Sequence, residues 1–305
     1  MDSTIFDTIT TTFVGAFQSG TATLAQYSLP LLAIFATIAF YLQLGPLLAS
    51  GGVGAGDAIA STLLTILKIG VFYWLLVRLA PLTTAAFQTF LQWGAAPGDG
   101  GLSEAAFLTP SKVVDVGFAI VTPIRTYTDR LLNWAAVWSW PTLLTYVLAY
   151  YLILLAFAGI ALHLMMTIIE FHLAVMAATV LLPWGGLPPT AFFAEFSIGW
   201  VTGGLVRILL TAAMVGIALP LFASIKVTTI GPDPTLYTAL LAGLSAGVFL
   251  VLSWVIPARA AAIAGRGVSL ALHGGTIVSA AASGGRGVAA VARKIRGEPR
   301  LAATR

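Results

Sequence analysis

The stretch TLLTYVLAYYLILLAFAGIALHLMMTIIEFHLAVMAATVLLP, residues 142–183, is apolar almost throughout and decides the fold class. No Gly or Pro lies between Gly159 and Pro183, so nothing in that half interrupts a helix. One helix of this length would exceed about 60 Å, roughly twice the thickness of a hydrocarbon core. The segment is therefore either one crossing with a long extension or a tight hairpin broken near His163 to His172. Periodicity does not decide between the two.

The whole chain shares this apolar character. Of its 305 residues, 59% are hydrophobic and 9% are charged, whereas soluble domains are about 45–50% apolar and about 25% charged. Fifteen Lys and Arg with eleven Asp and Glu are too few to cover the surface of a soluble globular domain of this size. A single soluble globular domain is excluded, and lipid is the expected solvent. Because there is no Cys, disulfides and cysteine-ligated metal sites are excluded as well.

Four more segments are apolar enough to cross a bilayer: residues 28–49, 59–80, 199–223 and 238–256. Residues 81–141 are punctuated by charges, too polar to span and too long for a simple turn. We therefore expect an all-α polytopic transmembrane bundle of about five spans. Residues 81–141 would form a central extramembrane loop with short helices, closed by Trp134, Trp138 and Trp140 at the bilayer interface.

The distribution of charge predicts the orientation. The first 30 residues hold Asp2 and Asp7 and no base, whereas the last 47 hold eight bases and one acid. A basic chain can also bind nucleic acid, but basic flanks of a membrane protein stay cytoplasmic. We expect a periplasmic segment 1–27, a periplasmic loop 81–141, a cytoplasmic break 183–198 and a basic cytoplasmic tail 257–305. Ends on opposite sides require an odd number of spans, which favours a single crossing for residues 142–183.

Ionisable residues inside a span are functional candidates. His163 and Glu170 are seven residues apart and share a helix face, so a proton relay or a metal site is conceivable. Two ligands make no metal site, however. The simpler interpretation is that Glu170 lies at the membrane boundary or pairs with a base such as Lys68. The long side chains of Lys68 and Arg207 can reach an interface by snorkelling.

The sequence contains no nucleotide-binding GxxxxGK[ST], no HExxH and no GxSxG pattern. We therefore expect no enzyme, and predict no catalytic, cofactor-binding or metal-binding residue.

The heptapeptide PWGGLPP, residues 183–189, is a strong helix breaker. Non-helical backbone cannot face lipid, so this segment must lie in water, in protein or along a wet cavity. Trp184 and Phe192 are large apolar side chains, and a turn exposed to water would leave them unfavourably solvated. Glu195, which follows, would be either a charge that faces a partner or a helix cap. We expect the segment to fold back and pack against a neighbouring protomer or partner. The alternative is an ordinary interfacial loop anchored by Trp184.

Two pairs of glycines recur with a spacing of four residues inside apolar spans. They are Gly199 with Gly203 and Gly243 with Gly247. Such GxxxG patterns allow helices to approach closely, which predicts a packed bundle and, less directly, a homo-oligomer.

The stretch TIIEFHLAVMAATVLLPWGGLPPTAFFAEFSIGW, residues 167–200, resembles the TrbL family of conjugative type IV secretion systems. Three short pieces carry the resemblance, although Phe is more usual than Trp184 in the break. From them come the candidate functional residues, which are Glu170, Pro183, Trp184, Gly185, Thr190, Phe192 and Glu195.

This resemblance implies a multi-pass protein of the bacterial inner membrane with an outer N-terminus, about five spans and an inner C-terminus. Such proteins multimerise among membrane lipids, contact pilus-associated subunits and secretion ATPases, and support pilus assembly or substrate passage. Nucleic acid would be a partner only as transported substrate. The alternative class is a secondary transporter for a small solute, but the internally repeated halves typical of transporters are not evident.

Overall fold

The computed structural model describes residues 4–50, 55–98, 109–131, 140–225, 230 and 234–266. These residues form helices and no strand. In chain order the elements are α1 (Thr4–Ser50), α2 (Ala55–Ala95), η1 (Ala96–Gly98), α4 (Pro110–Leu131), α5 (Trp140–Leu181), η2 (Leu182–Gly186), η3 (Pro188–Thr190), α6 (Ala191–Ile225) and α7 (Leu236–Arg266). Five of the helices are long and apolar enough to cross a membrane. The expected all-α bundle with about five spans is confirmed.

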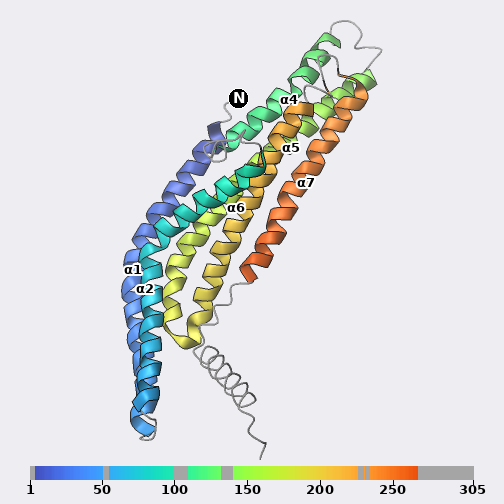
Figure 1. The fold of residues 1–305 in the computed structure, drawn as a ribbon. Helices are drawn as coiled ribbons and strands as arrows, with labels where there is room; N and C mark the ends of the chain where they lie inside the picture. The colour runs from blue at the N-terminus through green and yellow to red at the C-terminus, as the bar shows by residue number, and fades with distance from the viewer. Residues whose placement is uncertain are drawn as a thin grey trace, which may run out of the picture.

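Helix α5 is a single element of 42 residues, so the hairpin alternative for residues 142–183 is wrong. It is the central helix, and α1, α4, α6 and α7 all pack against it (Figure 1). Its buried residues recur at helical spacing on more than one face, which is typical of a helix enclosed by neighbours. One stripe consists of Ala149, Ile153, Phe157, Ile160, Leu164, Ile168 and Phe171, and Ala161, His163 and Met165 are buried on either side of it.

The other helices lie along different parts of α5. Helices α6 and α7 run antiparallel to each other beside it, and α4 lies along its N-terminal part. Helices α1 and α2 form a hairpin against the C-terminal part of α5, and this hairpin continues past the end of α5 (Figure 1). Leu32 on α1 and Phe72 on α2 mark the level at which α5 ends, because they contact Gly186 and Gly185.

Helix α1 begins at Thr4, well before the expected span at residue 28. Residues 4–27 are rich in Thr, whose hydroxyl competes with the backbone for hydrogen bonds. Here the competition is resolved within the helix. Thr10 donates to the carbonyl of Phe6 at 2.7 Å, and Thr21 donates to that of Phe17 at 2.7 Å. With its hydroxyls satisfied by the preceding turn, the segment continues the helix.

Two prolines expected to end spans lie inside helices instead. Pro81 is within α2, which continues to Ala95, and Pro257 is within α7, which continues to Arg266. Proline removes one backbone donor, but ending a helix in an apolar environment would leave several backbone groups unsatisfied. The helices therefore continue, and much of the expected loop 81–141 is the end of α2 together with α4. Trp134, Trp138 and the tail beyond residue 266 lie outside the described residues.

The interruption between α5 and α6 is also shorter than the expected 183–198. Helix α6 begins at Ala191, two residues after Pro189. We call residues 182–190 the break segment. Its brevity means that Phe192 and Glu195 belong to the first turns of α6 and not to a loop.

Candidate functional site

The break segment is an ordered double turn. Helices η2 and η3 are joined by Leu187, which is extended with φ −106° and ψ 123°. The N–H of Thr190 donates to the carbonyl of Leu187 at 3.1 Å, and its hydroxyl donates to the carbonyl of Trp184 at 2.9 Å. Thr190 therefore ties the two turns together, which gives a structural role to a residue first noted only by resemblance.

The inner side of the break segment packs against the hairpin of the same chain. The ring of Trp184 lies 4.9 Å from that of Phe35 on α1 and 5.6 Å from that of Phe193 on α6. Pro183 and Gly185 are buried, and a Cβ on Gly185 would overlap the ring of Phe72. We expected this segment to pack on a neighbouring protomer or partner, but Phe35 of α1 and Phe72 of α2 already occupy its inner side.

The first turns of α6, directly after the break segment, carry an aromatic patch, which we define as Phe192, Phe193 and Phe196. Their exposed fractions are 58%, 37% and 66%. The rings of Phe192 and Phe193 are 4.1 Å apart, so the exposed area is continuous between them. A cluster of exposed aromatic side chains is typical of contact with a partner or with the membrane interface.

Glu195 lies half-buried beside this patch and faces a base on another helix. Lys68 on α2 is within electrostatic range of its carboxylate. Lys68 is also half-buried, so a base on α2 and an acid on α6 lie within Coulombic range of each other. Glu170 does pair with a base, as expected, but that base is Arg207 and not Lys68.

Glu170 pairs with Arg207 instead. Arg207 Nη1 on α6 donates to Glu170 Oε2 on α5. The Arg207 side chain is only 17% exposed, so it turns inward to its partner and does not snorkel to an interface. This ion pair joins the two helices that the break segment connects.

His163 lies seven residues before Glu170 on α5, about two helical turns, and is fully buried. Its ring packs against that of Trp254 on α7 at 5.7 Å, and neither ring nitrogen has a hydrogen-bond partner. In the described part of the chain no group of three or more His, Asp or Glu could hold a metal ion. The arrangement of His163, Glu170 and Arg207 thus favours helix pairing over metal binding.

The glycines of the expected oligomer face are used within the chain. A Cβ on Gly199 would lie 2.5 Å from the carbonyl oxygen of Gly265 on α7, and one on Gly203 would lie 2.9 Å from that of Ala261. Gly243 is close to Leu152 of α5, whereas Gly247 has open space around it. The first pair therefore holds α6 against α7, and this face is not available to a second copy.

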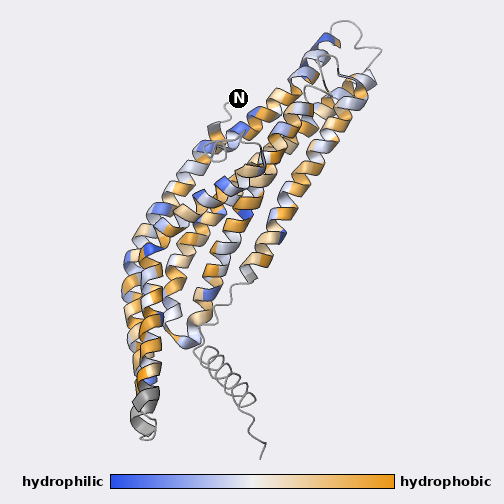
Figure 2. Cartoon of the chain, viewed as in Figure 1, coloured by the Kyte–Doolittle hydropathy of each residue, from blue (hydrophilic) through white to orange (hydrophobic). Residues whose placement is uncertain are grey.

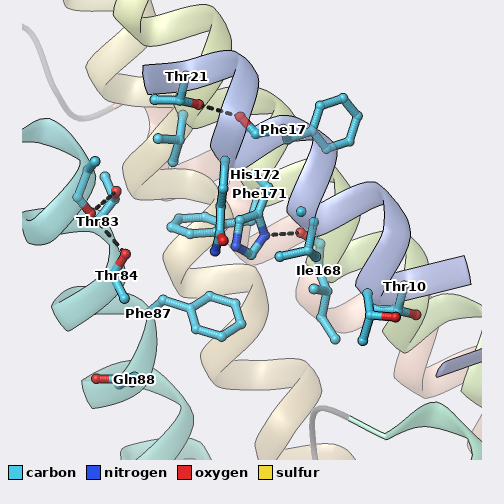
Figure 3. Close-up of a pocket in the computed structure, with 16 residues that line it drawn as sticks. Thr10, Phe17, Thr21, Thr83, Thr84, Phe87, Gln88, Ile168, Phe171 and His172 are labelled. Atoms are coloured by element: carbon cyan, nitrogen blue, oxygen red, sulfur yellow. Dashed lines mark hydrogen bonds between the residues drawn. The ribbon is translucent and has the colours of Figure 1, made fainter. Parts of the chain in front are cut away.

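A cavity that the sequence did not predict lies between α1, α2 and α5 (Figure 3). Its volume is about 400 Å³, and many of its lining residues are polar. His172 Nδ1 is 2.9 Å from the carbonyl of Ile168. The cavity was missed because residues 4–27 were not expected to be part of a span. The available clue was the recurrence of Thr and Gln at helical spacing. The polar lining residues are Thr10, Thr11, Gln18, Thr21, Thr83, Thr84, Gln88 and His172.

These features define a multi-pass helical membrane protein in which two long helices are joined by a buried, ordered break. The sequence of the chain matches the family described as TrbL/VirB6 plasmid conjugal transfer protein over residues 36–256. That range covers well over half of the chain and includes the break segment, the Glu170–Arg207 ion pair and the aromatic patch. The chain belongs to this family, and the resemblance noted from residues 167–200 is confirmed.

No curated protein matches the chain. The family makes it a component of conjugal transfer by type IV secretion and a multi-pass protein of the inner membrane. Members of the TrbL/VirB6 family are structural components of the conjugation apparatus.

Proposed function

We propose that this chain is a structural subunit of the inner-membrane complex of a conjugative type IV secretion system. It supports pilus assembly or substrate passage as a homo-oligomer, among membrane lipids and beside pilus-associated proteins and secretion ATPases. Nucleic acid meets it only as transported substrate. The family assignment supports membership of a conjugal transfer apparatus. The packing around the break segment supports a structural role for the subunit.

The proposed orientation has the N-terminus in the periplasm and the C-terminus in the cytoplasm. The break segment and the end of α7 lie at the same end of the bundle, because Gly199 contacts Gly265. Arg259 and Arg266 lie at that end, and the residues after Arg266 are strongly basic. Basic flanks favour the cytoplasmic side, so the break segment is proposed to face the cytoplasm.

The aromatic patch is the single observation that carries the proposal of a docking role. Phe192, Phe193 and Phe196 project from α6 while the inner side of the break segment is held by Phe35 and Phe72. A rigidly supported set of exposed rings loses little conformational entropy when a partner covers it. Phe and Trp are also enriched in the buried cores of protein interfaces. The patch therefore suits another subunit of the secretion complex.

The test replaces Phe192 and Phe196 together by Ala and measures the frequency of conjugal transfer. Membrane level and copurifying subunits are measured in the same strain. The control is Ile263→Ala, because Ile263 is 75% exposed near the same end of the bundle but lies on α7. We expect transfer to fall at least about tenfold at normal membrane level, with loss of a copurifying subunit, because truncating buried aromatic side chains at an interface weakens binding strongly. The control should transfer normally.

Two further variants separate docking from folding. Glu195→Gln removes the charge beside the patch, and Trp184→Ala removes the ring that supports it. Normal transfer in the Phe192/Phe196 variant and in Glu195→Gln would reject the docking role. Loss of transfer that follows loss of the protein from the membrane would leave the break segment as a structural turn.

A further inference from the structure

The cavity between α1, α2 and α5 presents mainly hydrogen-bond acceptors. Its threonines donate their hydroxyl protons to their own helices, so each Oγ1 keeps only lone pairs for a ligand. Thr10 donates to the carbonyl of Phe6 at 2.7 Å. Thr83 donates to the carbonyl of Leu79 at 2.8 Å. The same arrangement holds for Thr11, Thr21 and Thr84. A ligand in the cavity therefore meets a group of hydroxyl oxygens that accept hydrogen bonds.

His172 adds a further acceptor. Its Nδ1 lies 2.9 Å from the carbonyl of Ile168, and because a carbonyl only accepts, Nδ1 carries the proton of the neutral ring. Nε2 then presents a lone pair. Gln18 and Gln88 line the same cavity, and each offers one amide oxygen. Figure 3 shows His172 between the threonines of α1 and those of α2.

Aromatic rings and one nearby carboxylate favour a positively charged ligand. Phe17, Phe87 and Phe171 line the cavity, and the rings of the last two are 5.3 Å apart. The face of such a ring attracts an ammonium group. Asp7 precedes Thr10 by three residues, so its carboxylate lies on the same face of α1 one turn away. Among the described residues that line the cavity, none is Lys or Arg.

The cavity lies between two apolar lengths of the bundle. Residues 140–162 of α5 carry no charge and lie on the side of the cavity towards the start of α5. Residues 28–45 of α1 carry no charge either and lie on the other side, where Leu32 contacts Gly186. Figure 2 shows that the projecting part of the α1–α2 hairpin is mostly hydrophobic. The two lengths are displaced along the bundle, so one bilayer cannot cover both.

The level between these two lengths is polar. Gly204 of α6 contacts Phe171, which lines the cavity. The adjacent Gly203 contacts Ala261 of α7, so the exposed Arg259 lies within about one turn of this level. Whichever apolar length lies in lipid, this level is its boundary with water. Phospholipid head groups occupy that boundary.

An exposed apolar surface adjoins the cavity. Phe13 is 47% exposed, and its ring lies 6.0 Å from that of Phe17, which lines the cavity. On α2, Leu82 is 40% exposed and directly precedes Thr83. A molecule with a polar head in the cavity and an apolar tail along these side chains fits both surfaces. This favours a lipid over a water-soluble amine.

We propose that the cavity binds the primary ammonium of a zwitterionic phospholipid head group, as in phosphatidylethanolamine. An ammonium has donors and no acceptor, which complements the threonine oxygens, the amide oxygens and His172 Nε2. The phosphate of the same head group stays close to the ammonium and lowers the cost of taking that charge out of water. The volume of about 400 Å³ lies in the range of small-molecule sites. This role goes beyond the docking role of the aromatic patch and does not depend on it.

The test compares three lipids on the purified full-length chain in detergent. Native mass spectrometry measures the binding of phosphatidylethanolamine, phosphatidylcholine and phosphatidylglycerol with the same acyl chains. Phosphatidylcholine keeps the positive charge but has no N–H donor, and phosphatidylglycerol has hydroxyl donors but a net negative charge. We expect phosphatidylethanolamine to bind at least about tenfold more tightly than either, because hydrogen bonds from a charged donor are the strong ones.

Two pairs of variants locate the binding. Gly15→Leu fills the cavity, because Gly15 lines it and a Cβ there meets nothing within 4 Å. Gly70→Leu is its control, because Gly70 also has open space around it but does not line the cavity. Thr83→Val removes one acceptor at nearly constant shape. Thr89→Val is its control, because Thr89 makes the same bond to the preceding turn of α2 but lies outside the lining.

We expect Gly15→Leu to weaken the binding of phosphatidylethanolamine at least about tenfold and Thr83→Val to weaken it about threefold, whereas both controls bind as the natural chain does. Circular dichroism checks that each variant is folded.

Each alternative result overturns the proposal. Equal binding of the three lipids would show only unspecific contact with the apolar surface. Equal binding of phosphatidylethanolamine and phosphatidylcholine would mean that N–H donors are not recognised, and tighter binding of phosphatidylglycerol would assign an anionic ligand. Unchanged binding in Gly15→Leu would place the lipid elsewhere. If Gly15→Leu also lost a copurifying protein while its lipid binding stayed unchanged, the cavity would belong to a protein segment.

Discussion

Arg207 of α6 turns inward and donates a hydrogen bond to Glu170 of α5, so charges from two separate apolar segments pair where those helices meet. The pair links α5 to α6 beyond the break segment. Lys68 of α2 lies within Coulombic range of Glu195 of α6. Intramembrane charges are tolerated when they are partnered. The charges in these spans thus serve first to set how the helices assemble.

Glu170→Gln should lower the thermal stability of the protein in detergent. Arg207 keeps its charge in a mostly buried position but loses the carboxylate. A hydrogen bond between charged groups is worth about 1.5–3 kcal/mol. Because the Glu170 side chain is 45% exposed and partly screened by solvent, we expect a loss of about 1–2 kcal/mol. Thermal unfolding followed by circular dichroism measures the effect.

The matched control for that prediction is the exchanged pair, Glu170→Arg with Arg207→Glu. It should recover part of the stability that Glu170→Gln loses, because attraction across the same two helices returns. Equal stability of Glu170→Gln and the natural protein would show that the pair contributes nothing.

Gly199→Ala should destabilise the individual chain. The new Cβ would meet the carbonyl oxygen of Gly265 at 2.5 Å, and helix backbone cannot yield as a flexible side chain does. Overpacking of this kind costs about 1–3 kcal/mol. Gly247→Ala is the control, because its Cβ would enter open space and Ala is the better helix former by about 1 kcal/mol.

Thermal unfolding and size-exclusion chromatography in detergent, at a concentration where the chain is monomeric, separate the possible outcomes. Loss of self-association in Gly199→Ala without any loss of monomer stability would contradict the intramolecular contact and restore this face as an oligomer interface.

Gly185→Ala should displace the ring of Phe72, which is buried beneath the break segment. We expect a loss of stability of about 1–3 kcal/mol from the overlap. Adding Phe72→Leu should recover part of it, because the smaller side chain makes room for the methyl group. A double-mutant cycle on thermal stability measures the coupling. Strictly additive effects would mean that the two residues do not share this space.

The orientation can be tested with reporter fusions. Alkaline phosphatase fused after residue 135, ahead of α5, should be active because the periplasm permits its disulfides to form. The same enzyme fused after residue 290 should be inactive, since basic flanks stay in the cytoplasm. An active fusion at residue 290 would reject the proposed orientation of the C-terminus.

The sequence by itself determined the class of protein and the place of the break. Long apolar runs predict spans because transfer into lipid depends mainly on composition over about 20 residues. Pro183, Pro188 and Pro189 predict the end of a helix because each removes a backbone donor, whatever surrounds it. The family resemblance came from this same stretch, where local chemistry is most restrictive. These are properties of the chain that hold before it packs.

Only the tertiary structure decided which residues meet. Arg207 donates a hydrogen bond to Glu170, Lys68 lies within Coulombic range of Glu195, and Gly199 contacts Gly265. Each contact depends on the register between two helices, and the periodicity within one helix does not determine that register. The continuation of α2 through Pro81 also depends on the apolar environment of the assembled bundle, where a helix end would leave backbone groups unsatisfied.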